Sequence, residues 1–273
     1  MLNFFKETPP TAIFGMLVIL ATAVLGIFAP WIAPFGETQI VGAEYLPWGD
    51  SGHILGTDNL GRDMLSRMIY GARNTVGLAI LTTAIAFSIG AFLGVFAALK
   101  GGWIDQAVSR VIDVLMAVPP LILALILLAI LGSSIPNMIG VIAVIYVAPV
   151  FRLSRAAAMD IVQLDFIQAA RLRGEGTLWL IQREILPNIT STLLAEFGLR
   201  FCFVFLFIAA LSFLGLGIQP PTADWGSMVK ENATLISFGD ITPLIPAAAI
   251  GLVTVAINFV VDWMLQRASG LKE

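Results

Sequence analysis

Long stretches without a single Asp, Glu, Lys or Arg constrain the fold of this chain more than any other feature of its sequence. They cover residues 8–36, 74–99, 114–151, 201–223 and 241–261 of a chain of 273 residues. A helix needs about 20 apolar residues to cross the roughly 30 Å hydrocarbon core of a bilayer. Because unpaired backbone groups are costly in lipid, segments of this kind cross the membrane as helices. The sequence therefore predicts an all-α integral membrane protein.

The number of crossings follows from where these stretches break. The third stretch is too long for one helix, and residues 132–137, Gly-Ser-Ser-Ile-Pro-Asn, favour a turn within it. The first is longer than a signal-peptide core and its flank is barely basic, so we expect it to be retained. Six spans are predicted, at residues 12–32, 76–98, 108–131, 138–155, 193–215 and 242–263. We divide the chain into an N-terminal anchor with an extracytoplasmic segment, residues 1–75, and a five-helix core, residues 76–273.

Composition excludes several classes of function. Hydrophobic residues make up 58% of the chain and charged residues 12%, with a net charge of −3, so no basic surface is available for nucleic acid. One cysteine, Cys202, and one histidine, His53, leave no basis for a disulfide or a cluster of metal ligands. The chain also lacks the GxxxxGK[ST] phosphate loop. We expect membrane lipid to surround it, and we expect no cofactor, no metal and no nucleic acid to bind.

The distribution of Lys and Arg predicts the orientation. With the N-terminus in the cytoplasm, most basic residues of the connections lie on the cytoplasmic side, and only Arg62, Arg67, Arg73 and Lys230 lie outside. Both termini are then cytoplasmic, as is the connection between the fourth and fifth spans, residues 160–188.

That cytoplasmic connection has a helical pattern of its own. Residues 165–173 favour a helix with Phe166, Ala169 and Ala170 on one face, and residues 174–176, Gly-Glu-Gly, favour a turn. A second helix is predicted to follow and to end at Pro187. Small residues would let another protein approach closely, with Arg171 and Arg173 at the rim. The alternative is a pair of helices lying on the membrane surface.

Three sets of residues resemble one family. Gln168-Ala169-Ala170, then Gly174 after three residues, and Leu186-Pro187-Asn188 are similar to the EAA signature of ABC importer permeases. The segments 53–73 and 211–226 resemble those of the C-type permeases for dipeptides, oligopeptides and nickel. The resemblance covers nearly the whole chain. It differs at Gln168, where the family usually has Glu, so a salt bridge at that position is in question.

The resemblance implies a fold, a role and a set of partners. It implies the type I importer permease fold, in which loop 160–188 is a coupling helix that contacts an ATPase through Gln168, Ala169, Ala170, Arg171, Arg173 and Gly174. It further implies a second, homologous permease, two ATP-binding subunits and an extracytoplasmic binding protein in the inner membrane of a prokaryote. The chain itself would catalyse no reaction. The cargo would be a peptide or, alternatively, nickel or another small solute.

Residues inside the spans supply candidates for a pathway or gate. Glu196 and Arg200 are four apart and can pair on one helix face, and we expect the pair near the cytoplasmic end of the fifth span. Pro119 and Pro120 should kink or break the third helix, which gives the bundle a place to bend. We expect no charge at the middle of a span. Two other classes remain open, a secondary transporter and a membrane enzyme, although inverted repeats, midplane charges and convergent polar groups are not evident.

Overall fold

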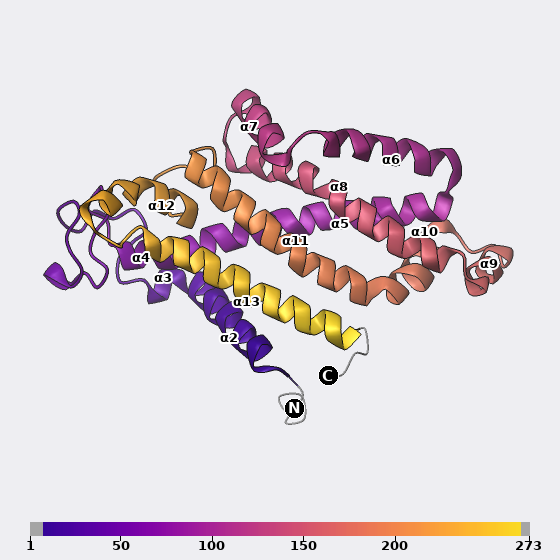
Figure 1. The fold of residues 1–273 in the computed structure, drawn as a ribbon, viewed down its shortest axis with the longest axis horizontal. Coiled ribbons are helices and arrows are strands. Elements are labelled where there is room, and N and C mark those ends of the chain that lie inside the picture. Colours follow the sequence, from indigo (N-terminus) through magenta and orange to yellow (C-terminus); the bar gives the residue numbers. More distant parts are fainter. Residues whose placement is uncertain (1–7, 269–273) are drawn as a thin grey trace.

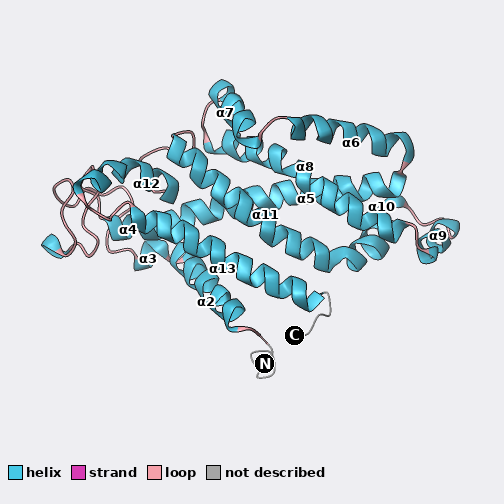
Figure 2. Ribbon diagram, viewed as in Figure 1, coloured by secondary structure: helices cyan, strands magenta, loops and turns pink. Residues whose placement is uncertain are grey.

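The computed structural model describes residues 8–268, and nearly all of its regular structure is helical (Figures 1 and 2). The five longest helices are α2 (Pro10–Ile27), α5 (Gly77–Lys100), α8 (Ile135–Val162), α11 (Leu186–Leu214) and α13 (Leu244–Ala268). The shorter α-helices are α3 (Ala29–Ile32), α4 (Met64–Gly71), α6 (Gly102–Ala117), α7 (Pro120–Leu131), α9 (Asp165–Leu172), α10 (Thr177–Trp179) and α12 (Trp225–Asn232). The prediction of an all-α membrane protein is confirmed.

Two of the spans extend well beyond their predicted limits, because short π-helical segments join neighbouring helices. Segment η2 (Ala72–Val76) connects α4 to α5, so that a continuous helix runs over Met64–Lys100. Segment η3 (Leu180–Ile185) connects α10 to α11 in the same way and gives a continuous helix over Thr177–Leu214. The connections at these ends of the two spans are therefore partly rigid extensions of the membrane helices.

The third span is not the single helix predicted over residues 108–131. Helices α6 and α7 meet at an angle of 87°, and counting this bent pair as one span gives six crossings by length and composition. The break lies at Pro119 and Pro120, as predicted, because Val118 and Pro119 have extended backbone angles and neither proline can donate a backbone hydrogen bond. The pair of prolines thus ends one helix and begins the next.

The centre of the bundle is formed by α5 and α8, which run parallel and pack along their length. Added Cβ atoms would lie 2.8 Å from the Val147 carbonyl oxygen at Gly90 and 2.6 Å from the Phe151 carbonyl oxygen at Gly94. No larger residue fits at this separation of the backbones, as expected for glycines spaced four apart on a membrane helix. Helix α11 then packs against α5, α8 and α13.

The two ends of the bundle differ. Segment 33–63, α3, α4 and α12 form a folded layer at one end, which we call the outer layer after the side of the membrane predicted for it, and α9 projects from the other end (Figure 1). Helix α2 packs against α13 so closely that a Cβ at Gly15 would lie 2.4 Å from the Ala256 carbonyl oxygen. Residues 8–75 therefore contact the core along a helix pair, and the division of the chain at residue 75 stays a prediction.

Candidate docking surface and membrane-embedded ion pair

Helix α9 is a short, sharply ended helix at the exposed end of the bundle. Gly174 follows it with a φ of 83°, in the left-handed region. The Glu175 amide donates to the Ala170 carbonyl at 3.2 Å, and the Gly174 amide donates to the Arg171 carbonyl at 3.0 Å. These two bonds form a Schellman motif, which satisfies carbonyls that a helix end otherwise leaves unpaired. The predicted glycine turn is confirmed.

The two faces of α9 have different surroundings. Ile167 and Ala170 are fully buried and pack with Leu180, Ile181 and Ile185 of the following segment. The predicted docking residues Gln168, Ala169, Arg171, Arg173 and Gly174 are exposed, as are Phe166 and Leu172. Ala170 thus belongs to the core below the helix and not to the exposed face on which it was expected beside Ala169. The buried face anchors α9 and leaves the opposite face free for a partner.

Arg171 joins α9 to the end of a membrane helix. Its guanidinium donates to the Leu99 carbonyl oxygen at 2.8 Å, in the last turn of α5. Carbonyls there lack a helical partner and carry the negative end of the helix dipole, so a cation stabilises them. By contrast, the Gln168 side-chain amide lies 3.5 Å from the Val162 carbonyl, at the limit of a hydrogen bond.

The second helix of this connection does not end at Pro187 as predicted. It continues from α10 through η3 into α11 without a break. The reason is the π-helical turn at Leu180–Ile185, whose wider hydrogen-bonding pattern accommodates a residue that has no backbone N–H. The segment that follows the Gly174 turn is therefore continuous with the fifth span as one helix.

Glu196 and Arg200 form the predicted ion pair. The Arg200 Nε atom donates to Glu196 Oε1 at 3.0 Å, and both side chains are largely buried. The Arg200 guanidinium carbon lies 5.8 Å from the Tyr146 ring centre and 5.4 Å from that of Phe203. Tyr146 belongs to α8, so the pair lies where α11 meets α8.

The pair lies within the continuous helix Thr177–Leu214, which contains the fifth span. The expectations that the pair lies near the cytoplasmic end of that span and that no span carries a charge near its midpoint stay predictions. A paired, aromatic-flanked arginine in this place is a candidate for function, because ionisable groups inside a membrane are costly.

A second group of buried charges lies in the outer layer. Asp58 Oδ2 accepts a hydrogen bond from Arg62 Nε at 2.6 Å and forms an ion pair with Arg67, whose Nε atom lies 3.2 Å away. Glu231 Oε2 accepts from the same two guanidiniums at 3.1 and 3.3 Å. Two carboxylates thus balance two guanidiniums. Both arginines are almost fully buried, with 2% of Arg62 and 1% of Arg67 exposed. Sequence reasoning missed Glu231 as a partner of these arginines, because it is far away from them in the chain.

The outer layer also holds two helix caps. Asp63 accepts from the Ser66 amide at 2.8 Å and from His53 Nδ1 at 2.9 Å, so it caps α4. Asp224 accepts from the Ser227 amide at 2.8 Å and caps α12. Burial raises the pKa of the Asp224 carboxyl, and hydrogen bonds from Ser227 and Thr75 oppose that rise. These contacts join the segments 53–73 and 211–226 into one folded surface.

Comparison with known proteins agrees with this architecture. Residues 90–269 match the family described as "Binding-protein-dependent transport system inner membrane component". The chain is 35% identical to the di/tripeptide transport system permease protein of Pseudomonas aeruginosa, over 92% of this chain and 85% of that protein. It is 35% identical to a peptide transport system permease protein of Escherichia coli over 95% and 89% of the two chains. A glutathione transport system permease protein of Escherichia coli is 35% identical over 92% and 83%.

Proposed function

Because this chain belongs to the family of binding-protein-dependent transport system inner membrane components, we propose that it is the permease of a peptide importer and forms the pathway with a second, homologous permease. The observation that carries this proposal is the 35% identity to a di/tripeptide permease over 92% of the chain. The cargo is a short peptide, since the relatives are permeases for dipeptides, peptides and glutathione. ATP hydrolysis belongs to partner subunits.

The exposed face of α9 is the surface on which one ATP-binding subunit docks. Phe166 and Leu172 are 39% and 90% exposed, so this short helix presents two large apolar side chains to its surroundings. Gln168 and Ala169 lie between them on the same short helix, with Arg171 and Arg173 beside them. An apolar centre with a polar and basic rim fits a protein partner. Two permeases would present two such surfaces and bind two ATPases.

Movement of α9 has two direct routes into the membrane. One is the hydrogen bond from Arg171 to Leu99 at the end of α5, and the other is the helix Thr177–Leu214 that contains α11. Both elements also pack against α9 through the buried cluster that includes Ile167 and Ile185. Closure of the ATPases on this surface would therefore shift α5 and α11 together and change access to the pathway.

Two features inside the membrane are candidates for the pathway or its gate. The break at Pro119 and Pro120 allows α7 to change its angle relative to α6 without breaking a regular helix. The pair of Glu196 and Arg200 contacts Tyr146, so it sits where α11 meets α8. We assign gating to the proline break and a contact with the cargo's charged termini to the ion pair.

The outer layer supplies the surface for an extracytoplasmic binding protein. Its backbone is fixed by the ions around Asp58 and Glu231 and by the caps at Asp63 and Asp224, so it can present exposed side chains in fixed positions. With the outer layer on the extracytoplasmic side, α9 and both termini lie in the cytoplasm of a prokaryotic cell, and the chain lies in the inner membrane.

The experiment that tests this assignment is purification of the assembled complex from its native membrane. We expect a second six-span permease and one or two ATPases to copurify. The double variant Phe166→Asp, Leu172→Asp should lose the ATPases and keep the second permease, whereas Ile54→Asp, at an exposed outer residue, should lose neither. A chain that purifies alone in several mild detergents would contradict the assignment.

The cargo is tested in proteoliposomes that contain the assembled complex and its binding protein. We expect ATP-dependent uptake of a labelled tripeptide that unlabelled dipeptides and tripeptides compete away. Uptake of Ni²⁺ without uptake of peptides would overturn the peptide assignment and leave the permease role intact.

A further inference from the structure

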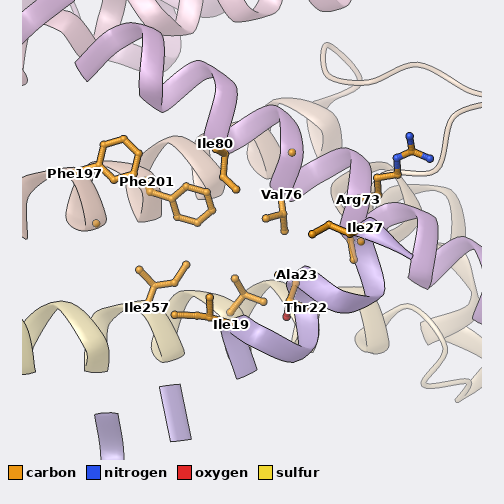
Figure 3. Close-up of a pocket in the computed structure, with 15 residues that line it drawn as sticks. Ile19, Thr22, Ala23, Ile27, Arg73, Val76, Ile80, Phe197, Phe201 and Ile257 are labelled. Carbon is orange, nitrogen blue, oxygen red and sulfur yellow. The ribbon is translucent and has the colours of Figure 1, made fainter. Parts of the chain in front are cut away.

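An apolar cavity of about 610 Å³ lies among α2, η2, α5, α11 and α13 (Figure 3). Its walls are almost entirely hydrocarbon, from Ile19 and Ile27 on α2, Ile80 on α5, and Phe201 and Ile257 on α11 and α13. Ile27 and Ile80 are 66% and 49% exposed, so the cavity opens to the surroundings of the chain. Arg73 stands at the end nearest the outer loops, with its guanidinium directed away from the apolar lining (Figure 3).

The cavity extends from the outer end of the helices toward their middle. Its lining includes Arg73 at one end and Phe197 at the other, and the Phe197 ring contacts Phe87 at 5.3 Å between ring centres. On α2 the lining runs from Ile19 to Ile27, which is about 12 Å along the helix at 1.5 Å per residue. A cavity of this length and a volume of 610 Å³ has a mean cross-section of about 50 Å².

These dimensions and surroundings select the occupant. A helix about 10–12 Å across is too wide for the cavity. Water finds almost no hydrogen-bond partners on such walls, and an empty cavity would forfeit dispersion contacts. An extended hydrocarbon chain is narrower than the cavity and can lie along it. Arg73 forms no ion pair within residues 8–268, and a guanidinium binds phosphate oxygens in a bidentate manner.

We propose that this cavity binds one phospholipid of the outer leaflet, with an acyl chain between α2 and the core and its phosphate on Arg73. The lipid completes the packing of α2 against α5, α11 and α13, which otherwise leave a gap beside the close contact at Gly15. This inference does not depend on the cargo or on the docking surface.

Gly77 allows the cavity to be filled by a single substitution. It lines the cavity in an ordinary helical conformation, and an added Cβ would meet no atom within 4 Å. Gly251 on α13 has equally open surroundings and does not line the cavity, so it serves as the matched control. Phe at position 77 should therefore occupy the space of the acyl chain without disturbing the helix.

The test is native mass spectrometry of the assembled complex, released from detergent with added phosphatidylglycerol. We expect the wild-type complex and Gly251→Phe to retain a phospholipid bound to this chain, and Gly77→Phe to retain it at least tenfold less often. Arg73→Ala should lower retention severalfold and Arg73→Lys should restore part of it. Equal retention by Gly77→Phe and wild type would overturn the site, and an unchanged Arg73→Ala would overturn the phosphate contact.

A photocrosslinking residue at Ile80 identifies the occupant directly. We expect it to capture a phospholipid in native membranes, detected as an added mass of one lipid on the chain. Capture of the second permease instead of lipid would show that a protein covers this surface and would overturn the proposal.

Discussion

Gly174 ends the docking helix in a conformation that other residues adopt only with strain. Its φ of 83° lies in the left-handed region, which costs other residues about 1–2 kcal/mol. We expect Gly174→Ser to loosen the end of α9 and to lower transport-coupled ATP hydrolysis severalfold in proteoliposomes. Gly176→Ser is the matched control, because Gly176 has a φ of −74° at a helix N-cap and serine is favoured there. Normal coupling in Gly174→Ser would contradict the role of this turn.

Gln168 tests whether charge matters on the docking face. Its side chain is exposed and makes only one long contact within the chain, so replacing it by Glu changes no packing. A negative charge in the first half of α9 is also compatible with the helix dipole. We expect Gln168→Glu to retain transport and coupled ATP hydrolysis within about twofold of wild type, a range that corresponds to less than 1 kcal/mol. Complete loss of coupling would show that the partner requires an uncharged side chain there.

At the scale of elements, the sequence predicted the helices better than their ends. The apolar stretches identify all five long helices, and the prolines at 119 and 120 identify the break between α6 and α7. The angle of 87° and the continuation through Pro187 were not predictable, because both depend on packing and on π-helical turns that have no sequence signature.

The contact between α8 and α11 depends on the ion pair of Glu196 and Arg200. Replacing Arg200 by Met leaves the Glu196 carboxylate buried without its partner, a change that typically costs about 3–5 kcal/mol. We expect Arg200→Met to lower the thermal midpoint of the purified complex by several degrees, whereas Glu196→Gln with Arg200→Met should recover most of it. If the pair contacts the cargo, the stable double variant still fails to import peptide. An unchanged midpoint in Arg200→Met would contradict the buried pair.

At the scale of the whole molecule, some candidate residues are neighbours in sequence and others are far apart along the chain. Residues of the docking surface are neighbours in sequence, so their turn and exposed face follow from local pattern, with Ala170 as the exception. The outer ion network joins residues 164 apart, Arg67 and Glu231, and no local pattern reveals such a partner. The lipid cavity likewise exists only where four distant segments meet.

Glu231 joins the last third of the chain to the first third through its ion pairs with Arg62 and Arg67 in the outer layer. With Gln at this position, Arg62 and Arg67 keep only Asp58 as a counter-charge, although they are almost fully buried. Loss of one member of a buried ionic group typically costs about 3–5 kcal/mol, so we expect segment 37–63 to open locally in Glu231→Gln. Hydrogen exchange of that segment should accelerate at least tenfold while α5 and α8 stay protected.

Glu44→Gln, at an exposed residue, is the control for this prediction. Adding Arg62→Met to Glu231→Gln should slow exchange again, because it removes the excess positive charge. Unchanged exchange in Glu231→Gln would show that the outer layer is held by its apolar contacts and helix caps alone.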